Sequence, residues 1–152
     1  HFMLGLGLSL APIGAYISVT GIFNITPLLF SFIVLTWVSW FDIIYALQDD
    51  EFDKSNHLHS LPSATGRKKA LYISIIVHII TFLLVLSVGF IINGGYLFWT
   101  GATIFTSLLI YQHRIVKYDD LSKVTRAFGT TNGIASIFFA IFVIIDLFIR
   151  NQ

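Results

Sequence analysis

Five long apolar runs constrain this sequence more than any other feature. They cover approximately residues 2–20, 28–47, 70–92, 96–111 and 124–149. Each run is long enough, or nearly so, to cross the ~30 Å hydrocarbon layer of a bilayer as an α-helix. A transmembrane β-barrel would instead need alternating segments of about ten residues. The pattern predicts an all-α, polytopic transmembrane helical bundle of five spans, the first of them kinked at Pro12.

The composition supports lipid as the solvent of this chain. Of its 152 residues, 56% are hydrophobic and only 11% are charged. A soluble domain of this length needs more polar surface to cover its core. A net charge of +1 indicates no nucleic-acid partner. The absence of cysteine excludes a disulfide framework and thiolate chemistry.

The distribution of basic residues predicts an orientation. Successive spans alternate sides of the membrane, so the connections between them form two groups. Eight of the nine lysines and arginines lie in the connections 48–69 and 112–123 or just after the second of these. The ninth is Arg150, beyond the last span. The positive-inside rule therefore places the two charged connections in the cytoplasm and the C-terminus outside.

An acidic cluster follows the second span. Asp49 and Asp53 are four residues apart, so on a helix both carboxylates share one face. Like charges at this spacing repel each other, and a divalent cation would reverse that repulsion. Mg²⁺ is commonly held by one or two carboxylates while substrate phosphates complete its shell. By spacing alone, a Mg²⁺–diphosphate site and an ordinary solvated helix end are about equally good interpretations.

Asp42 favours the functional interpretation. On a continuous helix Asp42 and Tyr45 share the face of Asp49, with Asp42 about 10 Å deeper at 1.5 Å per residue. An ionisable side chain inside the membrane costs roughly 2–3 kcal/mol and usually faces a cavity or a partner. We therefore expect a cavity beneath the carboxylate pair.

Several segments together resemble the UbiA family of prenyltransferases, closest to its 4-hydroxybenzoate polyprenyltransferase branch. Residues 42–53 and 58–62, with Asp-Ile-Ile-Tyr-Ala-Leu-Gln-Asp and Leu-His-Ser-Leu-Pro, resemble the second aspartate-rich region of that family. The resemblance extends to residues 11–17 and to Phe-Gly-Thr-Thr-Asn-Gly at 128–133. It covers nearly the whole chain, and the combination is specific where each piece alone is not.

The resemblance implies that the five spans are the last five of a nine-helix fold. Residues 1–152 would then form the C-terminal part of a single membrane domain, in a bacterial inner membrane. The chain starts at His1 without an initiator methionine, and no basic segment typical of a signal peptide precedes its first apolar run. We expect a first aspartate-rich region upstream, and we expect the isolated 152-residue chain not to catalyse prenyl transfer.

The family chemistry implies Mg²⁺-dependent transfer of a polyprenyl group from an allylic diphosphate to an aromatic acceptor. The acceptor favoured by the resemblance is 4-hydroxybenzoate, in ubiquinone biosynthesis. A dihydroxynaphthoate-type acceptor of menaquinone biosynthesis and other quinone or haem precursors stay open. By resemblance Asp49 and Asp53 are the Mg²⁺ ligands. Tyr45 and Asp42 would line the cavity, where an aromatic face can stabilise the allylic cation.

Three side chains are candidates for binding the diphosphate. His59 occupies a position where many family members carry a lysine or arginine, and Lys54 and Arg67 could share its role. A loop histidine that merely faces water is an equally good interpretation of His59. Two other classes also fit: a transporter that couples ions at Asp42, and a non-catalytic membrane assembly subunit. Carboxylates at the cytoplasmic end favour a diphosphate over a midplane transport site.

The remaining polar positions receive structural interpretations. We expect Asp119 and Asp120 to cap the start of the last span. Gly129 and Gly133 form a G-x-x-x-G pattern, which predicts close helix packing. Two interpretations of Asn132 between them stay open, a hydrogen bond across helices and a place at the cavity mouth, and packing is the favoured role. His78 lies in the third span, and no metal role is expected because we expect no second histidine nearby.

Overall fold

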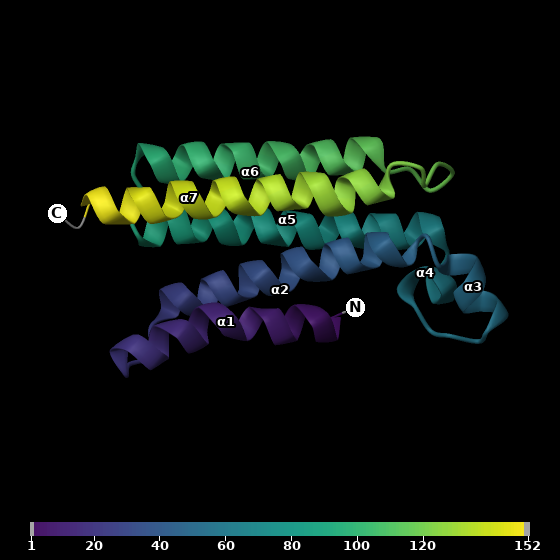
Figure 1. Ribbon diagram of the computed structural model, residues 1–152, viewed down its shortest axis with the longest axis horizontal. Helices are drawn as coiled ribbons and strands as arrows, with labels where there is room; N and C mark the ends of the chain where they lie inside the picture. Colours follow the sequence, from purple (N-terminus) through teal and green to yellow (C-terminus); the bar gives the residue numbers. More distant parts are fainter. Residues whose placement is uncertain (1, 151–152) are drawn as a thin grey trace.

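The computed structural model describes residues 2–150, apart from the side chains of Phe2 and Phe128. All regular elements within that range are helical, and the long helices run side by side along one axis (Figure 1). The elements are α1 (Phe2–Thr20), α2 (Ile25–Ala46), α3 (Asp50–Ser55), α4 (Leu61–Thr65), α5 (Arg67–Ile91), α6 (Tyr96–Ile115), the π-helical segment η1 (Arg126–Thr131) and α7 (Asn132–Arg150). The predicted all-α fold is confirmed.

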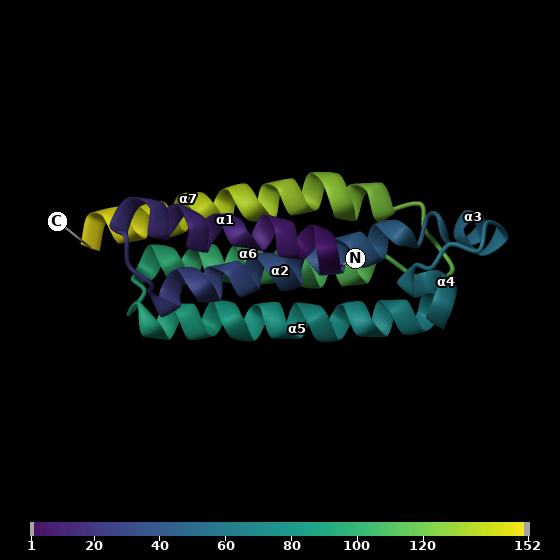
Figure 2. The same cartoon turned by 90° about the horizontal axis from the view of Figure 1, so that it is seen from below.

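Four segments of the described chain are long and apolar enough to cross a bilayer. They are α1, α2, α5 and the segment Gly129–Arg150, which comprises the end of η1 and the whole of α7. The helix α6 has 20 residues, but its C-terminal end carries Gln112, His113 and Arg114, which lower its mean hydropathy. Figure 2 shows α6 running along the bundle between the levels of α7 and α5. A membrane-spanning role for α6 therefore stays a prediction.

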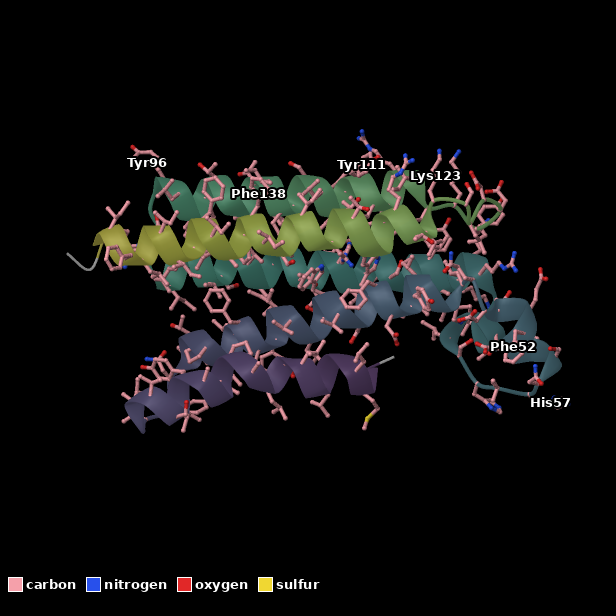
Figure 3. The ribbon with its side chains drawn as sticks, viewed as in Figure 1. Phe52, His57, Tyr96, Tyr111, Lys123 and Phe138 are labelled. Atoms are coloured by element: carbon pink, nitrogen blue, oxygen red, sulfur yellow. The ribbon has the colours of Figure 1, made fainter. Side chains whose placement is uncertain are left out.

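The two ends of the bundle differ. At what we call the hairpin end, short connections join α1 to α2 and α5 to α6 (Figure 1). At the opposite loop end lie α3, α4 and the connection 116–125. Figure 3 places His57 and Lys123 at the loop end and Tyr96 at the hairpin end.

Local backbone structure explains why α2 and α5 begin earlier than the apolar runs predicted. Asn24 Oδ1 accepts a hydrogen bond from Thr26 N at 2.8 Å, so α2 starts at Ile25. Gly66 has a φ of +86°, which separates α4 from α5 and lets α5 start at Arg67. In both cases the helix includes polar residues that hydropathy alone assigns to the connection.

The predicted kink at Pro12 has a counterpart in the structure. Figure 1 shows α1 bending along its length, and the Ile13 amide donates to Ser31 Oγ on α2 at 3.3 Å. Proline removes a backbone donor and crowds the preceding turn, so a neighbouring amide is free to bond outside the helix. This contact ties α1 to α2.

The buried core fixes the rotation of α2 at the loop end. Trp40, Ile43 and Leu47 are all buried in one cluster, where Trp40 stacks on a side chain of α5. At about 100° per residue, Asp42 and Tyr45 point roughly 200° and 140° away from Trp40. Asp42 and Tyr45 therefore lie on the side of α2 opposite its contact with α5, where α1 packs against the side chain one turn before Asp42.

Candidate active site

The acidic segment is not a continuation of α2. The helix ends at Ala46, and Gln48 N donates to the backbone oxygen three residues earlier at 3.0 Å in a tight turn before α3 begins. The prediction that Asp42 and Tyr45 share one continuous helix face with Asp49 and Asp53 is therefore wrong, because the two pairs lie on either side of the turn. The physical reason is that the turn carries Asp50 into the bundle, where its side chain is 2% exposed.

Asp49 and Asp53 nevertheless remain one helical turn apart. The Asp53 amide donates to the Asp49 carbonyl at 2.8 Å, so the predicted i, i+4 relation holds within this shorter element. The Asp49 side chain is exposed and does not cap α3, and Asp53 is half-buried. Neither carboxylate forms an ion pair with another described residue.

Asp50 is the residue that sequence analysis missed. Its Oδ2 accepts hydrogen bonds from Lys54 Nζ and Arg67 Nε, both at 2.9 Å. Arg67 Nη2 also donates to Glu51 Oε1 at 3.1 Å. The i, i+4 spacing of Asp50 and Lys54 was the available signal for this pair. The four acids thus sort into two neutralised by basic side chains, Asp50 and Glu51, and two that are not.

The candidate diphosphate-binding residues are only partly brought together. Lys54 and His59 line one surface pocket of about 280 Å³, together with His57 and Ser63. Arg67 is absent from that lining and is held by the acids of α3 instead. His59 is exposed, so the structure is compatible with both interpretations of this side chain.

The loop that carries His59 is fixed from its C-terminal side. Ser63 N donates to Ser60 Oγ at 3.3 Å, and Ser60 N donates to Ser63 Oγ at 2.8 Å. This reciprocal capping box, with Pro62 in the first turn, starts α4 directly after His59.

Tyr45 and Asp42 lie on α2 above the turn. Tyr45 is 45% exposed and Asp42 is half-buried, on the side of the helix away from Trp40. This side of α2 also faces α1, and a role in lining a cavity stays a prediction for both residues.

The donor set suits Mg²⁺ shared with a substrate. Within residues 2–150, no three histidine, aspartate or glutamate side chains are grouped to hold a metal by themselves. Mg²⁺ in phosphate-transfer sites is typically bound by one or two carboxylates and keeps phosphate oxygens and waters for its other positions. Asp49 and Asp53 supply a set of that size.

A polar cluster joins α2, α6 and α7. Asn132 Oδ1 accepts hydrogen bonds from Gln112 Nε2 at 2.7 Å and from Trp37 Nε1 at 3.2 Å. Of the two interpretations of Asn132, the hydrogen bond across helices is thereby confirmed. The close packing predicted for Gly129 and Gly133 is wrong, because a methyl group at either would meet nothing within 4 Å. The π-helical segment η1 changes the helical register here and leaves both glycines in open space.

Two further expectations from the sequence concern Asp120 and His78. Asp120 Oδ1 accepts from Ser122 N at 3.0 Å and from Ser122 Oγ at 2.6 Å, in a turn that precedes the helix. The predicted capping of the last span by Asp119 and Asp120 is wrong, because the N-cap residue of η1 is Thr125, whose side chain forms no capping hydrogen bond. These bonds from Ser122 hold the pKa of the Asp120 carboxyl below its usual range. The statement that His78 has no histidine near it is wrong, since His78 Nδ1 lies 2.8 Å from His113 Nε2. Sequence analysis missed His113 because the two are 35 residues apart.

The helices and the loop-end carboxylates together define an integral membrane protein with an acidic site at one end of a helical bundle. The sequence model of the UbiA prenyltransferase family matches residues 1–143, and the chain belongs to that family. The chain is similar to a 4-hydroxybenzoate octaprenyltransferase of Chromohalobacter salexigens, with 26% identity over 106 residues. That match covers 70% of this chain and 35% of the relative, so the chain spans about a third of the relative's length. No solved structure matches the chain.

Proposed function

We propose that this chain is part of a Mg²⁺-dependent enzyme that transfers a polyprenyl group from an allylic diphosphate to an aromatic acceptor, with 4-hydroxybenzoate as the favoured acceptor. The observation that carries the proposal is a difference among the four acidic residues at the start of α3. Asp49 and Asp53 lack ion-pair partners among the described residues, while the acids beside them are neutralised. The similarity to the 4-hydroxybenzoate octaprenyltransferase of Chromohalobacter salexigens supports the acceptor.

The residues divide the chemistry between them. Asp49 and Asp53 would hold Mg²⁺ together with the diphosphate, and the ion would supply positive charge to the departing diphosphate. Lys54 and His59, which line one pocket, donate hydrogen bonds to the same leaving group. The allylic carbon–oxygen bond breaks, an acceptor ring carbon bonds to the allylic carbon, and the ring then loses a proton. The face of Tyr45 stabilises the allylic cation between these events.

The orientation belongs to the same proposal. Lys54 and Arg67 lie at the loop end and Arg150 lies at the hairpin end of the bundle (Figure 1). We therefore assign the loop end to the cytoplasm of a bacterial inner membrane, where a diphosphate substrate is available. Reporter fusions at 48–69 and 112–123 test this, and a reporter active only outside the cell at either place contradicts it.

The deciding experiment is a transfer assay with the full-length protein in nanodiscs. We expect release of diphosphate and formation of prenylated 4-hydroxybenzoate, both dependent on Mg²⁺. Dihydroxynaphthoate in a parallel reaction tests the menaquinone-type alternative. Absence of diphosphate release with every acceptor, from protein shown to be folded, would overturn the proposal.

A further inference from the structure

A groove lies between α5 and α6. Its larger hollow has a volume of about 430 Å³, within the range of roughly 300–1,000 Å³ typical of ligand pockets. Most of the lining is aliphatic or aromatic, including Ile79, Phe82 and Ile110. The polar side chains of the lining are Thr106, His78, His113 and Arg114. The hollow is therefore apolar over most of its length and basic at one end.

A second hollow adjoins the first toward the loop end. It has a volume of about 300 Å³ and shares Ile75 with the larger one. Lys68 and Lys117 line it, with Asp119 as its single acid. Together with Arg114 the rim carries three permanent positive charges against one negative charge. The groove thus combines an apolar channel with a net positive mouth.

The histidine pair gives an independent sign of a ligand. The His78 ring stacks on Trp40 at 3.9 Å between centroids and bonds to His113 through Nδ1. His78 is 4% exposed, and its Nε2 has no hydrogen-bond partner among the described residues. A buried polar atom without a partner is unfavourable. A polar ligand atom entering the groove is one way to relieve that cost.

The groove is separate from the candidate active site. His78 and His113 contact the Trp40 side of α2, and Asp42 and Tyr45 point the other way from that helix. None of the four candidate residues of α2 and α3 lines either hollow.

We propose that the α5–α6 groove is a binding site for an anionic glycerophospholipid. One acyl chain lies along Ile79 and Phe82, and the phosphate lies among Arg114, Lys117 and Lys68. Basic pockets between membrane helices at the cytoplasmic side suit anionic head groups, because each lysine or arginine there attracts the phosphate. A zwitterionic lipid gains less from the positive rim, and a water-soluble phosphate cannot use the apolar channel. The site does not depend on the proposed transferase chemistry.

The test uses the full-length protein, delipidated in detergent and then titrated with phosphatidylglycerol or phosphatidylcholine. Native mass spectrometry counts the bound lipid. We expect preferential binding of phosphatidylglycerol, and a loss of roughly fivefold in its affinity for each of K68Q, R114Q and K117Q. The matched control is K69Q, which removes the same charge from the next residue of α5 without touching the groove. The variant I79W fills the channel and should weaken binding with the rim intact.

Four outcomes would overturn the proposal. Equal affinity for the two lipids would show that the rim does not select charge. An equal loss of phosphatidylglycerol affinity in K69Q and K68Q would show that the lipid is attracted by surface charge in general and not by the groove. Displacement of the lipid by millimolar inorganic phosphate would identify a water-soluble ligand instead. A lipid-free dimer that dissociates in I79W would show that a second copy of the protein covers the groove. Because Lys68 is exposed, K68Q tests the site even if R114Q fails to fold.

Discussion

Both ends of the bundle bury an aspartate against an arginine, yet they use the pair differently. At the hairpin end, Asp146 is 3% exposed and accepts hydrogen bonds from Gly95 N at 2.9 Å and Arg150 Nη1 at 3.3 Å. Arg150 Nη2 then donates to the Ile92 carbonyl at 2.7 Å. These bonds fasten α7 to the turn between α5 and α6, and no further acid lies beside them in the sequence.

At the loop end the corresponding aspartate is Asp50, which is paired with Arg67. Further carboxylates lie beside this pair without a basic partner within residues 2–150. Asp50 Oδ1 has no hydrogen-bond partner among the described residues, and Asp49 and Asp53 flank the pair without cations of their own. Uncompensated like charges one turn apart are unfavourable in a purely structural site. The difference suggests that the hairpin end serves stability, whereas the loop end gives up stability for binding.

The largest effect should follow the loss of either unpaired carboxylate. We expect Asp49→Ala and Asp53→Ala each to lower kcat/KM on the order of 100-fold or more in the full-length protein, because each removes a Mg²⁺ ligand and the charge stabilisation that depends on it. Transfer assays at saturating Mg²⁺ measure this. The hairpin-end variant Asp146→Ala serves as the control and should stay active. Near-normal turnover in either α3 variant would remove the distinction between the two ends.

A smaller loss is expected from Asp50→Asn. The change weakens the contacts that hold Lys54 and Arg67, so α3 and its two outer carboxylates lose part of their support. Residues that orient metal ligands typically contribute about 10–100-fold to metal affinity or activity. We expect a loss near the lower figure, seen as a higher Mg²⁺ concentration for half-maximal rate. An unchanged Mg²⁺ dependence, with a lower melting temperature alone, would make Asp50 as purely structural as Asp146.

The same comparison shows what sequence analysis can and cannot predict. Apolar runs predict helices well because burial in lipid is an additive property of consecutive residues. The turn after Ala46 is different, since it depends on Asp50 meeting Arg67, a residue 17 positions away. Helical periodicity carries no information about such a partner.

Two further errors have the same physical origin. The contact of His78 with His113 joins two helices, and nothing local to either residue indicates it. The G-x-x-x-G pattern presumes an α-helical register, which η1 does not have at Gly129. The spacing of Asp49 and Asp53 within one helical turn could be predicted from the sequence. Contacts between separate helices could not.

At the hairpin end the expected effect is on stability alone. Asp146→Ala leaves the Gly95 amide and the Arg150 guanidinium without their acceptor, at a cost of about 1–3 kcal/mol. We expect the melting temperature of the purified protein to fall by a few degrees, with kcat unchanged below the transition. The exposed neighbour Ile149→Ala is the matched control and should melt like the wild type. A fall in kcat for Asp146→Ala at low temperature would link the two ends functionally.

The smallest effect concerns His59, which lines one pocket with Lys54. If the His59 ring donates a hydrogen bond to the diphosphate, its loss in His59→Ala should raise the KM for the allylic diphosphate by a few-fold, with a smaller effect on kcat. His59→Lys keeps a donor at this position, so its KM should stay near that of the wild type. Steady-state transfer assays at varied diphosphate concentration measure these values. His57→Ala, in the same pocket, is the control and should leave the KM unchanged. An unchanged KM in His59→Ala as well would mean that His59 only faces water.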